Sequence, residues 1–229
     1  MTTARFEGFG PDLFEFFEDL EDDNSKAWFD AHRQVYLDQV KGPLDALLAE
    51  VEPEVGRGKA FRINRDTRFS ADKSPYKTQQ GAMIPRGASG TLYLHVDADG
   101  IMVGVGAPHL DAGQLERWRQ AVAGDPGVEL ASIVAGLRKA GYTVGTLAGD
   151  GLTEEPDLKR VPKPYPQDHP QGDLLRLKKV VAARSWARPA WLFDRRALTH
   201  VRKAWATADP LAAWLATHVG EGTEAPRRR

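Results

Sequence analysis

The sequence predicts an α+β fold in which a mainly antiparallel sheet, residues about 60–107, is packed with N- and C-terminal helices. Apolar residues recur at helical spacing before residue 56 and again after residue 110. Between these regions they alternate with polar residues, which is the period of a strand with one buried face. The turn sequence D-A-D-G at residues 97–100 separates two such runs and predicts a β-hairpin.

Three short helices are expected before the sheet. The first carries an apolar stripe at i, i+3, i+4 and i+7 after a proline suited to the first helical position: Pro11, Leu13, Phe16, Phe17 and Leu20. Asn24 is expected to cap the second helix, and Gly42-Pro43 to interrupt the helical region. Pro53 is expected to end the third helix.

The strands are expected to begin at Phe61, where the period changes from helical to alternating. A second short run is ended by Pro85. In the hairpin, Leu92, Leu94 and Val96 alternate with Tyr93, His95 and Asp97, and Ile101, Val103 and Val105 alternate with Met102, Gly104 and Gly106. The two glycines leave one strand face without side chains, so another element or a ligand must approach the backbone there.

Helices dominate the expected C-terminal half. Asp111 and Gln114 form a capping box, and a second helix carries Val128, Ile133, Val134 and Leu137. A short strand is expected at residues 142–144 and an ordered, proline-rich extended loop at 148–170. Further helices are expected around Leu174, Leu177 and Val181, after Asp194, and from Asp209-Pro210 onward.

Length and composition limit the expected number of domains and the expected location of the protein. A chain of 229 residues buries roughly 70–75% of its unfolded surface. We expect one α+β domain over residues 1–220 and a disordered tail at 221–229. No apolar run approaches the roughly 18–20 residues that cross a bilayer, so no membrane association is expected. Cysteine is absent and the N-terminus has no secretory pattern, which together predict a cytoplasmic location.

The net charge of −1 hides a strong segregation of charge along the chain. Residues 1–56 carry four Lys/Arg against fourteen Asp/Glu, a net charge of −10. Residues 57–86 carry eight against two, net +6, and residues 159–203 carry twelve against three, net +9. This pattern predicts either pairing within the protein or a cationic face.

The stretch F-R-I-N-R-D-T-R-F-S-A-D-K-S-P-Y-K-T at residues 61–78 concentrates five cations and only two carboxylates. Guanidinium groups bind phosphate or carboxylate bidentately, and the hydroxyls of Ser70, Ser74 and Thr78 can complete such a site. The second basic segment, residues 159–203, is expected to form the opposite wall of the ligand pocket. The predicted ligand-binding residues are Arg62, Arg65, Arg68, Lys73, Tyr76, Lys77, Lys163 and His169.

The same residues permit three hypotheses. The leading hypothesis is a pocket for a small phosphorylated or carboxylated ligand, in a protein that could also be an enzyme. The alternative is a nucleic-acid-binding module that uses the basic segments 57–86 and 159–203. In the third, Asp66 and Asp72 pair with the cations and the charges form a structural network without a ligand. The residues do not name a reaction.

The six histidines show no metal-ligand spacing, so neither a metal site nor a cofactor is expected. Motifs for a nucleophilic serine or a phosphate-binding glycine loop are absent as well. Only two histidines are candidates for a general acid or base. His95 shares a strand face with Tyr93 and Asp97, and His169 lies in the proline-rich loop.

Four groups of residues carry a resemblance to a known family. These are Asn24 with Trp28-Phe29 and Tyr36, the stretch 61–78, the segment P-K-x-Y-P-x-D-H-P at 162–170, and P-L-x-x-W-L at 210–215. Over roughly residues 6–217 the chain resembles the bacterial and fungal family known as domain of unknown function 2461. The resemblance implies one continuous domain, in which the stretch 61–78 and the loop 162–170 serve one function. It implies no catalytic residues.

Overall fold

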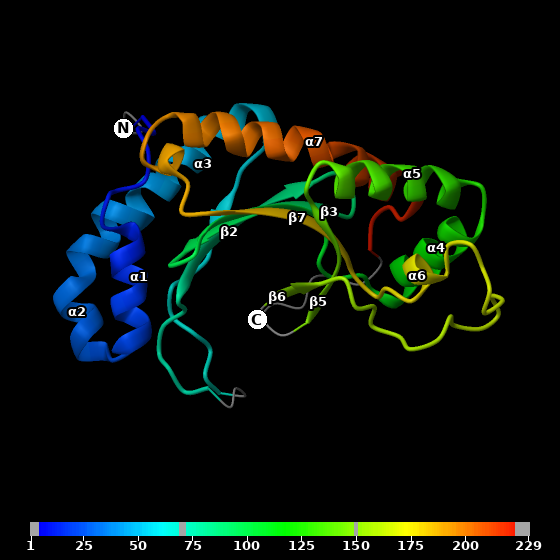
Figure 1. Ribbon diagram of the computed structural model, residues 1–229, viewed down its shortest axis with the longest axis horizontal. Helices are drawn as coiled ribbons and strands as arrows, with labels where there is room; N and C mark the ends of the chain where they lie inside the picture. Colours follow the sequence, from blue (N-terminus) through cyan, green and yellow to red (C-terminus); the bar gives the residue numbers. More distant parts are fainter. Residues whose placement is uncertain (1–4, 69–71, 149–150, 223–229) are drawn as a thin grey trace. The chain divides into compact units, whose positions relative to one another are not determined.

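The computed structural model describes residues 5–68, 72–148 and 151–222 (Figure 1). The predicted α+β class is confirmed: helices pack on a seven-stranded sheet with strand order β1-β2-β3-β4-β7-β5-β6. Of the predicted tail, residues 223–229 lie outside the described residues. Within the described ranges, no helix has both the length and the apolar character needed to cross a membrane.

Long connections precede β2 (residues 61–78) and α6 (residues 154–171). The helices are α1 (Leu13–Asp22), α2 (Lys26–Val35), the π-helix η1 (Tyr36–Lys41), α3 (Gly42–Val55), α4 (Ala112–Ala123), α5 (Pro126–Lys139), α6 (Gly172–Leu175), the 3-10 helix η2 (Ala190–Phe193) and α7 (Arg196–His218). The strands are β1 (Lys59–Ala60), β2 (Gln79–Arg86), β3 (Gly90–Asp97), β4 (Gly100–Ala107), β5 (Thr143–Ala148), β6 (Gly151–Thr153) and β7 (Val180–Ala187).

The described residues group into two compact units. The first comprises residues within 1–84, 93–103 and 185–203, and the second comprises residues within 85–92, 104–184 and 204–229. Strands β2, β3, β4 and β7 and helix α7 each contribute residues to both units. The prediction of a single domain over 1–220 stays a prediction.

In the first unit, α1 forms the predicted apolar stripe, but three boundaries of the N-terminal helices differ from the prediction. Ser25, not Asn24, caps α2, because its side chain accepts a hydrogen bond from the Trp28 amide (3.2 Å). Gly42-Pro43 does not interrupt the helical region. The Gly42 amide donates to the Leu37 carbonyl, five residues earlier, so the π-helix carries the chain directly into α3. Pro53 lies inside α3 and does not end it.

Charge pairing within the first unit accounts for part of the segregation along the sequence. Acidic residues of α1 and α3 face arginines of the 185–203 segment, forming the pairs Glu18–Arg188, Glu50–Arg195 and Glu54–Arg202. The Arg195–Glu50 pair is bidentate, with N–O distances of 3.0 and 2.9 Å. The acidic N-terminal segment therefore neutralises part of the second basic segment.

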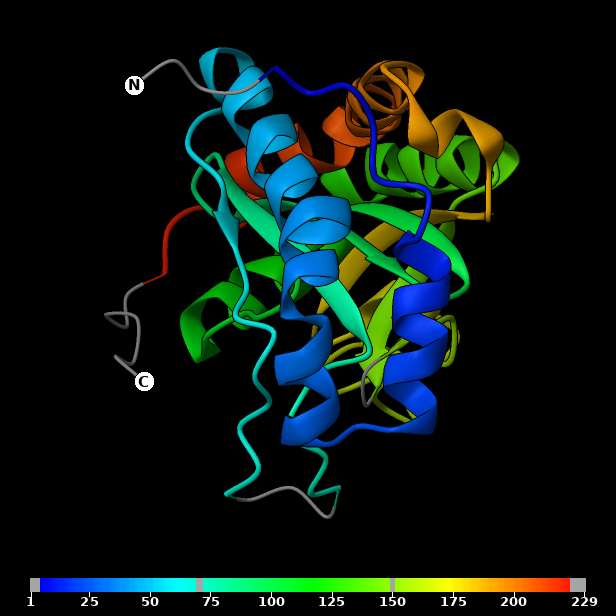
Figure 2. The same ribbon diagram turned by 90° about the vertical axis from the view of Figure 1, so that its left-hand side faces the viewer.

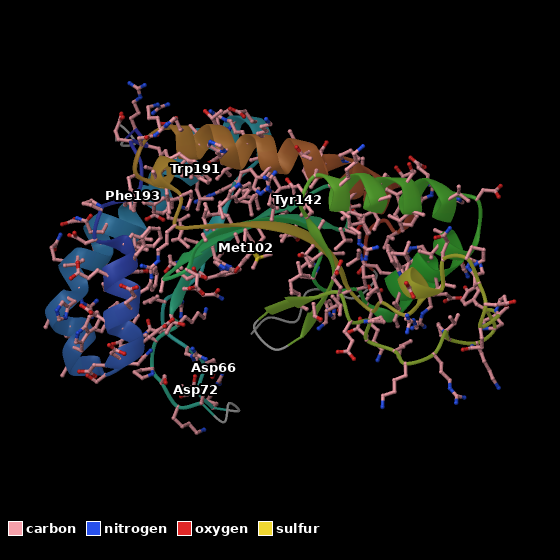
Figure 3. The ribbon with its side chains drawn as sticks, viewed as in Figure 1. Asp66, Asp72, Met102, Tyr142, Trp191 and Phe193 are labelled. Atoms are coloured by element: carbon pink, nitrogen blue, oxygen red, sulfur yellow. The ribbon has the colours of Figure 1, made fainter. Side chains whose placement is uncertain are left out.

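Strands β3 and β4 have one fully apolar face, as the alternation predicts. The buried residues on it are Leu92, Leu94, Val96, Ile101, Val103 and Val105. The opposite face of the hairpin carries polar and partly exposed side chains. Figure 3 shows Met102 on this second face, turned away from the helices. Pro85 lies within β2 and does not end it.

Strand β7 is the hydrogen-bonded neighbour of β4 in the sheet and passes close to both glycines, whereas the predicted approach of an element or a ligand over their face stays a prediction. A Cβ at Gly104 would lie 3.2 Å from the Ala183 Cβ, and one at Gly106 would lie 2.2 Å from the Val180 carbonyl oxygen. The predicted helix around Leu174, Leu177 and Val181 is therefore wrong beyond the short α6. The sheet extends past residue 107, and Val180–Ala187 is a strand between β4 and β5.

In the second unit, the predicted capping box of α4 is confirmed, with Asp111 and Gln114 bonding each other's backbone amides. The core of this unit includes Trp118, which is fully buried and contacts Trp214 edge-to-face at 5.5 Å. Of the apolar residues of the second predicted helix, now α5, Val134 and Leu137 are buried, whereas Val128 is 68% exposed. Pro210 lies inside α7 and does not open a separate helix.

We predict that Gly106→Ala destabilises the protein by about 3 kcal/mol. Gly106 adopts φ +156°, where side chains are strained, and the added Cβ would overlap the β7 backbone. Urea unfolding measures the change. Gly136→Ala in α5 is the matched control, because nothing lies within 4 Å of its Cβ position and alanine favours a helix. We expect it to stabilise the protein by about 0.5–1 kcal/mol. Equal effects of the two variants would contradict this prediction.

Candidate functional site

Residues 61–68 and 72–78 form an arm of two antiparallel segments that continues beyond β1 and β2, and we call these two segments the cationic arm (Figure 1). Backbone hydrogen bonds of 2.8 Å fix the two segments. The amides of Phe61, Lys77 and Arg65 donate to the carbonyls of Gly81, Ile63 and Pro75, respectively. An antiparallel bridge between Asn64 and Tyr76 lies among them. The backbone of the arm is therefore fixed over most of its described length.

The arm is also attached to the N-terminal helices, beside which it runs (Figure 2). The Asn24 side chain bonds both backbone groups of Tyr76: its Nδ2 donates to the carbonyl (3.1 Å) and its Oδ1 accepts from the amide (3.0 Å). The Tyr76 ring is buried and stacks on Phe29 at 4.0 Å. Asn24 thus positions the arm and does not cap a helix.

Both carboxylates of the arm are paired with arm arginines, and Figure 3 labels them toward its far end. The Asp66 carboxylate accepts hydrogen bonds from Nε and Nη2 of Arg68, at 2.9 and 2.7 Å. Asp72 forms an ion pair with Arg65, in which Oδ2 lies 2.8 Å from Nη1. The Arg65 side chain is only 22% exposed. Hydrogen bonds from Ser74, with the charge of Arg65 adding to them, lower the pKa of Asp72.

The two arm lysines hydrogen-bond to backbone carbonyls. Lys73 Nζ donates to Thr67 (2.9 Å), and Lys77 Nζ donates to Arg62 (3.0 Å) while lying 5.5 Å from the centre of the Phe61 ring. A carbonyl oxygen carries no full charge, so these bonds hold the lysines without neutralising them. Counted over residues 61–78, five cations and two carboxylates give a net charge of +3.

Six of the eight predicted ligand-binding residues lie in this arm, namely Arg62, Arg65, Arg68, Lys73, Tyr76 and Lys77. The other two, Lys163 and His169, belong to the second unit. Lys163 is exposed. His169 Nδ1 accepts from the Gln171 amide (3.0 Å), and Nε2 lies 3.3 Å from the Ala123 carbonyl, so both ring nitrogens hold the loop in place.

His169 also borders a surface pocket of about 300 Å³ within the second unit. Its charged and polar lining comprises Lys159, Arg160, Gln167, Asp168, His169, Asp173 and Arg176. Arg176 pairs with Asp173, and Gln167 Nε2 donates to the Val161 carbonyl at 2.7 Å. One cation of this pocket, Arg176, is therefore paired with a carboxylate.

A second polar cluster lies on β3, on the face that the alternation predicts. Tyr93 Oη lies 2.9 Å from Nδ1 of His95, and Nε2 of His95 lies 3.1 Å from Oδ2 of Asp97. His95 is 6% exposed, whereas Tyr93 is partly exposed and the Asp97 side chain is 25% exposed. The three side chains therefore form one hydrogen-bond chain that begins and ends near the surface.

The electrostatics of this chain fix the direction of its hydrogen bonds. Burial raises the pKa of Asp97, but His95 and the amides of Gly100 and Asp99 outweigh burial, so its pKa lies below the ordinary value. Burial, followed by the charge of Asp97, raises the pKa of Tyr93 to about 12. An ionised Asp97 only accepts, so Nε2 of His95 donates to it. In neutral His95, Nδ1 then accepts from the Tyr93 hydroxyl.

Phe61 connects the arm to this chain. The centre of its ring lies 5.5 Å from Nζ of Lys77 and 6.2 Å from the centre of the Tyr93 ring. Gly81 makes the approach possible, because a Cβ there would lie 3.0 Å from Tyr93 Oη and 3.2 Å from Phe61 Cδ2. No local sequence pattern predicts this role for Gly81. Across the described residues, no group of three or more His, Asp or Glu side chains could hold a metal ion.

We predict that Asn24→Ala destabilises the protein by roughly 2 kcal/mol and loosens the arm, because both backbone groups of Tyr76 lose their partner. Urea unfolding measures the stability, and limited proteolysis with mass spectrometry reports cleavage within residues 61–78. Asn64→Ala, an exposed position on the arm, is the control and should change stability by less than about 0.5 kcal/mol. Unchanged cleavage in Asn24→Ala would argue against its positioning role.

The raised tyrosine pKa values predict that stability falls as pH rises from about 10 to about 12. Unfolded tyrosines ionise near 10, whereas folded Tyr93 and Tyr36 keep their protons until about 12. The unfolded state therefore binds fewer protons in this window, and each tyrosine loses up to about 3 kcal/mol of stabilisation. Tyr93→Phe should flatten the pH dependence of the unfolding free energy in this window. A slope equal to that of the wild type would contradict the assignment.

The chain matches a family of known proteins. Searches of curated proteins and of solved structures found no match to the chain. A family model described as "Conserved hypothetical protein (DUF2461)" matches residues 12–214, a range that includes the N-terminal helices, the cationic arm and the β3 cluster. This agrees with the resemblance carried by the sequence motifs. The chain therefore belongs to the DUF2461 family of conserved hypothetical proteins.

Proposed function

We propose that this protein binds a small anionic ligand, phosphorylated or carboxylated, at the cationic arm. The observation that carries the proposal is the combination of a net charge of +3 over residues 61–78 with a backbone fixed by ladder bonds and by Asn24. A preformed cationic surface loses little conformational entropy when an anion binds, so more of the interaction energy appears as affinity.

The pairing pattern indicates which side chains contribute. The carboxylates of Asp66 and Asp72 are bound to Arg68 and Arg65. These pairs hold two guanidinium groups in place, while Arg62 and Lys73 are exposed. Arginine presents a planar fork of donors and lysine a compact point charge, and both match the oxygens of phosphate or carboxylate.

The nucleic-acid alternative draws less support from the contacts. It relies on a continuous exposed cationic stripe that includes residues 159–203. Within that segment, Arg188, Arg195 and Arg202 are bound to glutamates of α1 and α3. A structural charge network explains the Arg65–Asp72 pair but leaves the surplus charge without a role. A cytoplasmic location remains part of the proposal.

We predict that inorganic phosphate or pyrophosphate at about 10 mM raises the melting temperature by about 3–6 °C. A dissociation constant near 1 mM gives about 1.4 kcal/mol of stabilisation by linkage, which corresponds to this shift for a chain of this size. Scanning calorimetry in matched sodium chloride measures the shift, so that general salt effects are subtracted. An unchanged melting temperature with both anions contradicts the proposal.

Variants that remove cations inside or outside the arm locate the effect. Arg62→Gln/Lys73→Gln removes two exposed arm charges and should reduce the shift at least by half. Lys139→Gln, at the exposed end of α5, removes a cation outside the arm and should leave the shift intact. A shift that responds equally to both changes would indicate nonspecific screening and would overturn the assignment to the arm. Tight binding of mixed RNA at low salt, lost at high salt, would favour the nucleic-acid alternative instead.

A further inference from the structure

We propose that Tyr93, His95 and Asp97 form a group-transfer site in which Tyr93 is the nucleophile, His95 its general base and Asp97 the positioning residue. The proposed substrate class is a small ligand with an acyl or phosphoryl group. This inference goes beyond ligand binding by the arm and rests on separate observations, namely the distances, burial and exposure along β3.

The order of the three side chains matches what nucleophilic catalysis requires. A hydroxyl lies within hydrogen-bond distance of an imidazole nitrogen (2.9 Å), and a carboxylate lies on the other nitrogen (3.1 Å). The carboxylate holds the imidazole in the tautomer whose free nitrogen faces the hydroxyl. Alternation along β3 places all three on one face at positions i, i+2 and i+4.

The step balances within these groups. The Tyr93 oxygen forms a bond to phosphorus or to the carbonyl carbon, and the bond from that atom to the leaving group breaks. The Tyr93 proton passes to Nδ1 of His95, giving an imidazolium that the ionised Asp97 stabilises through Nε2. The imidazolium then protonates the leaving group. Water attacking the acylated or phosphorylated Tyr93 returns the site to its first state.

Burial and exposure are distributed as such a site needs. His95 is 6% exposed, which protects the base from water, whereas Tyr93 is partly exposed. The Phe61 ring contacts both Tyr93 and the Lys77 ammonium.

Reaction with benzenesulfonyl fluoride tests the proposal without a known substrate. Attack by a tyrosine oxygen on sulfur releases fluoride and leaves a stable sulfonate ester, which peptide mass spectrometry assigns to a residue. Tyr165, partly exposed in the second unit, is the internal reference on the same molecule. We expect Tyr93 to react roughly 100-fold faster than Tyr165 because of its general base. Equal rates, or a slower Tyr93, overturn the proposal.

The pH dependence and two variants separate base assistance from simple ionisation. With a pKa of about 12, phenolate at Tyr93 increases tenfold per pH unit, so an unassisted reaction rises tenfold between pH 8 and 9. A base-assisted reaction is nearly flat over that interval. His95→Gln should remove the advantage over Tyr165, and Asp97→Asn should reduce it. Retention of the advantage in a folded His95→Gln protein overturns the role of His95.

The experiments can contradict ligand binding by the arm and group transfer at Tyr93 independently of each other. Loss of the phosphate-induced stabilisation with fast modification of Tyr93 would exclude ligand binding by the arm and keep the reactive tyrosine. Stabilisation by phosphate with an unreactive Tyr93 would keep the arm as a binding site and exclude the group-transfer role.

Discussion

The apolar face of β3 is the constraint on which the candidate chemistry depends. Leu92, Leu94 and Val96 are almost fully buried, and the free energy of removing them from water fixes the strand register. Because side chains alternate across a strand, that register places Tyr93, His95 and Asp97 together on the opposite face. A slip of one residue would bury the polar set and expose the apolar one. The hydrogen-bond chain is therefore held by the core beneath it.

The sequence predicted the features that depend on local period and on nearby residues. The hairpin of β3 and β4, the stripe of α1 and the capping box of α4 all follow from contacts within a few residues. Strand β7 was missed because Leu174, Leu177 and Val181 fall at helical spacing, although V-V-A-A at 180–183 is also typical of a buried strand. Only the neighbours β4 and β5 decide between these two patterns.

The candidate site divides in the same way between local and distant determinants. The cations of the arm and the shared face of His95 with Tyr93 and Asp97 could be predicted, because both are patterns of adjacent residues. The attachment of Asn24 to Tyr76 spans 52 residues, and nothing in the local sequence marks it. Gly81 is a similar case, since its role depends on two aromatic rings brought together by the sheet. The pairs between α1 or α3 and residues 185–203 likewise depend on the tertiary fold.

Phe61 and Gly81 show how a binding arm and a reactive strand could act on the same ligand. The Phe61 ring contacts Lys77 on the arm and Tyr93 on β3, so the base of the arm and the hydroxyl end of the hydrogen-bond chain share one neighbour. The missing side chain at Gly81 lets the Tyr93 hydroxyl and the Phe61 ring approach each other, which a larger residue would hinder. An anion bound beside Lys77 would therefore share the Phe61 ring as a neighbour with Tyr93. If both proposals hold, this shared neighbour is where the binding arm and the reactive strand meet, and proximity is what group transfer requires.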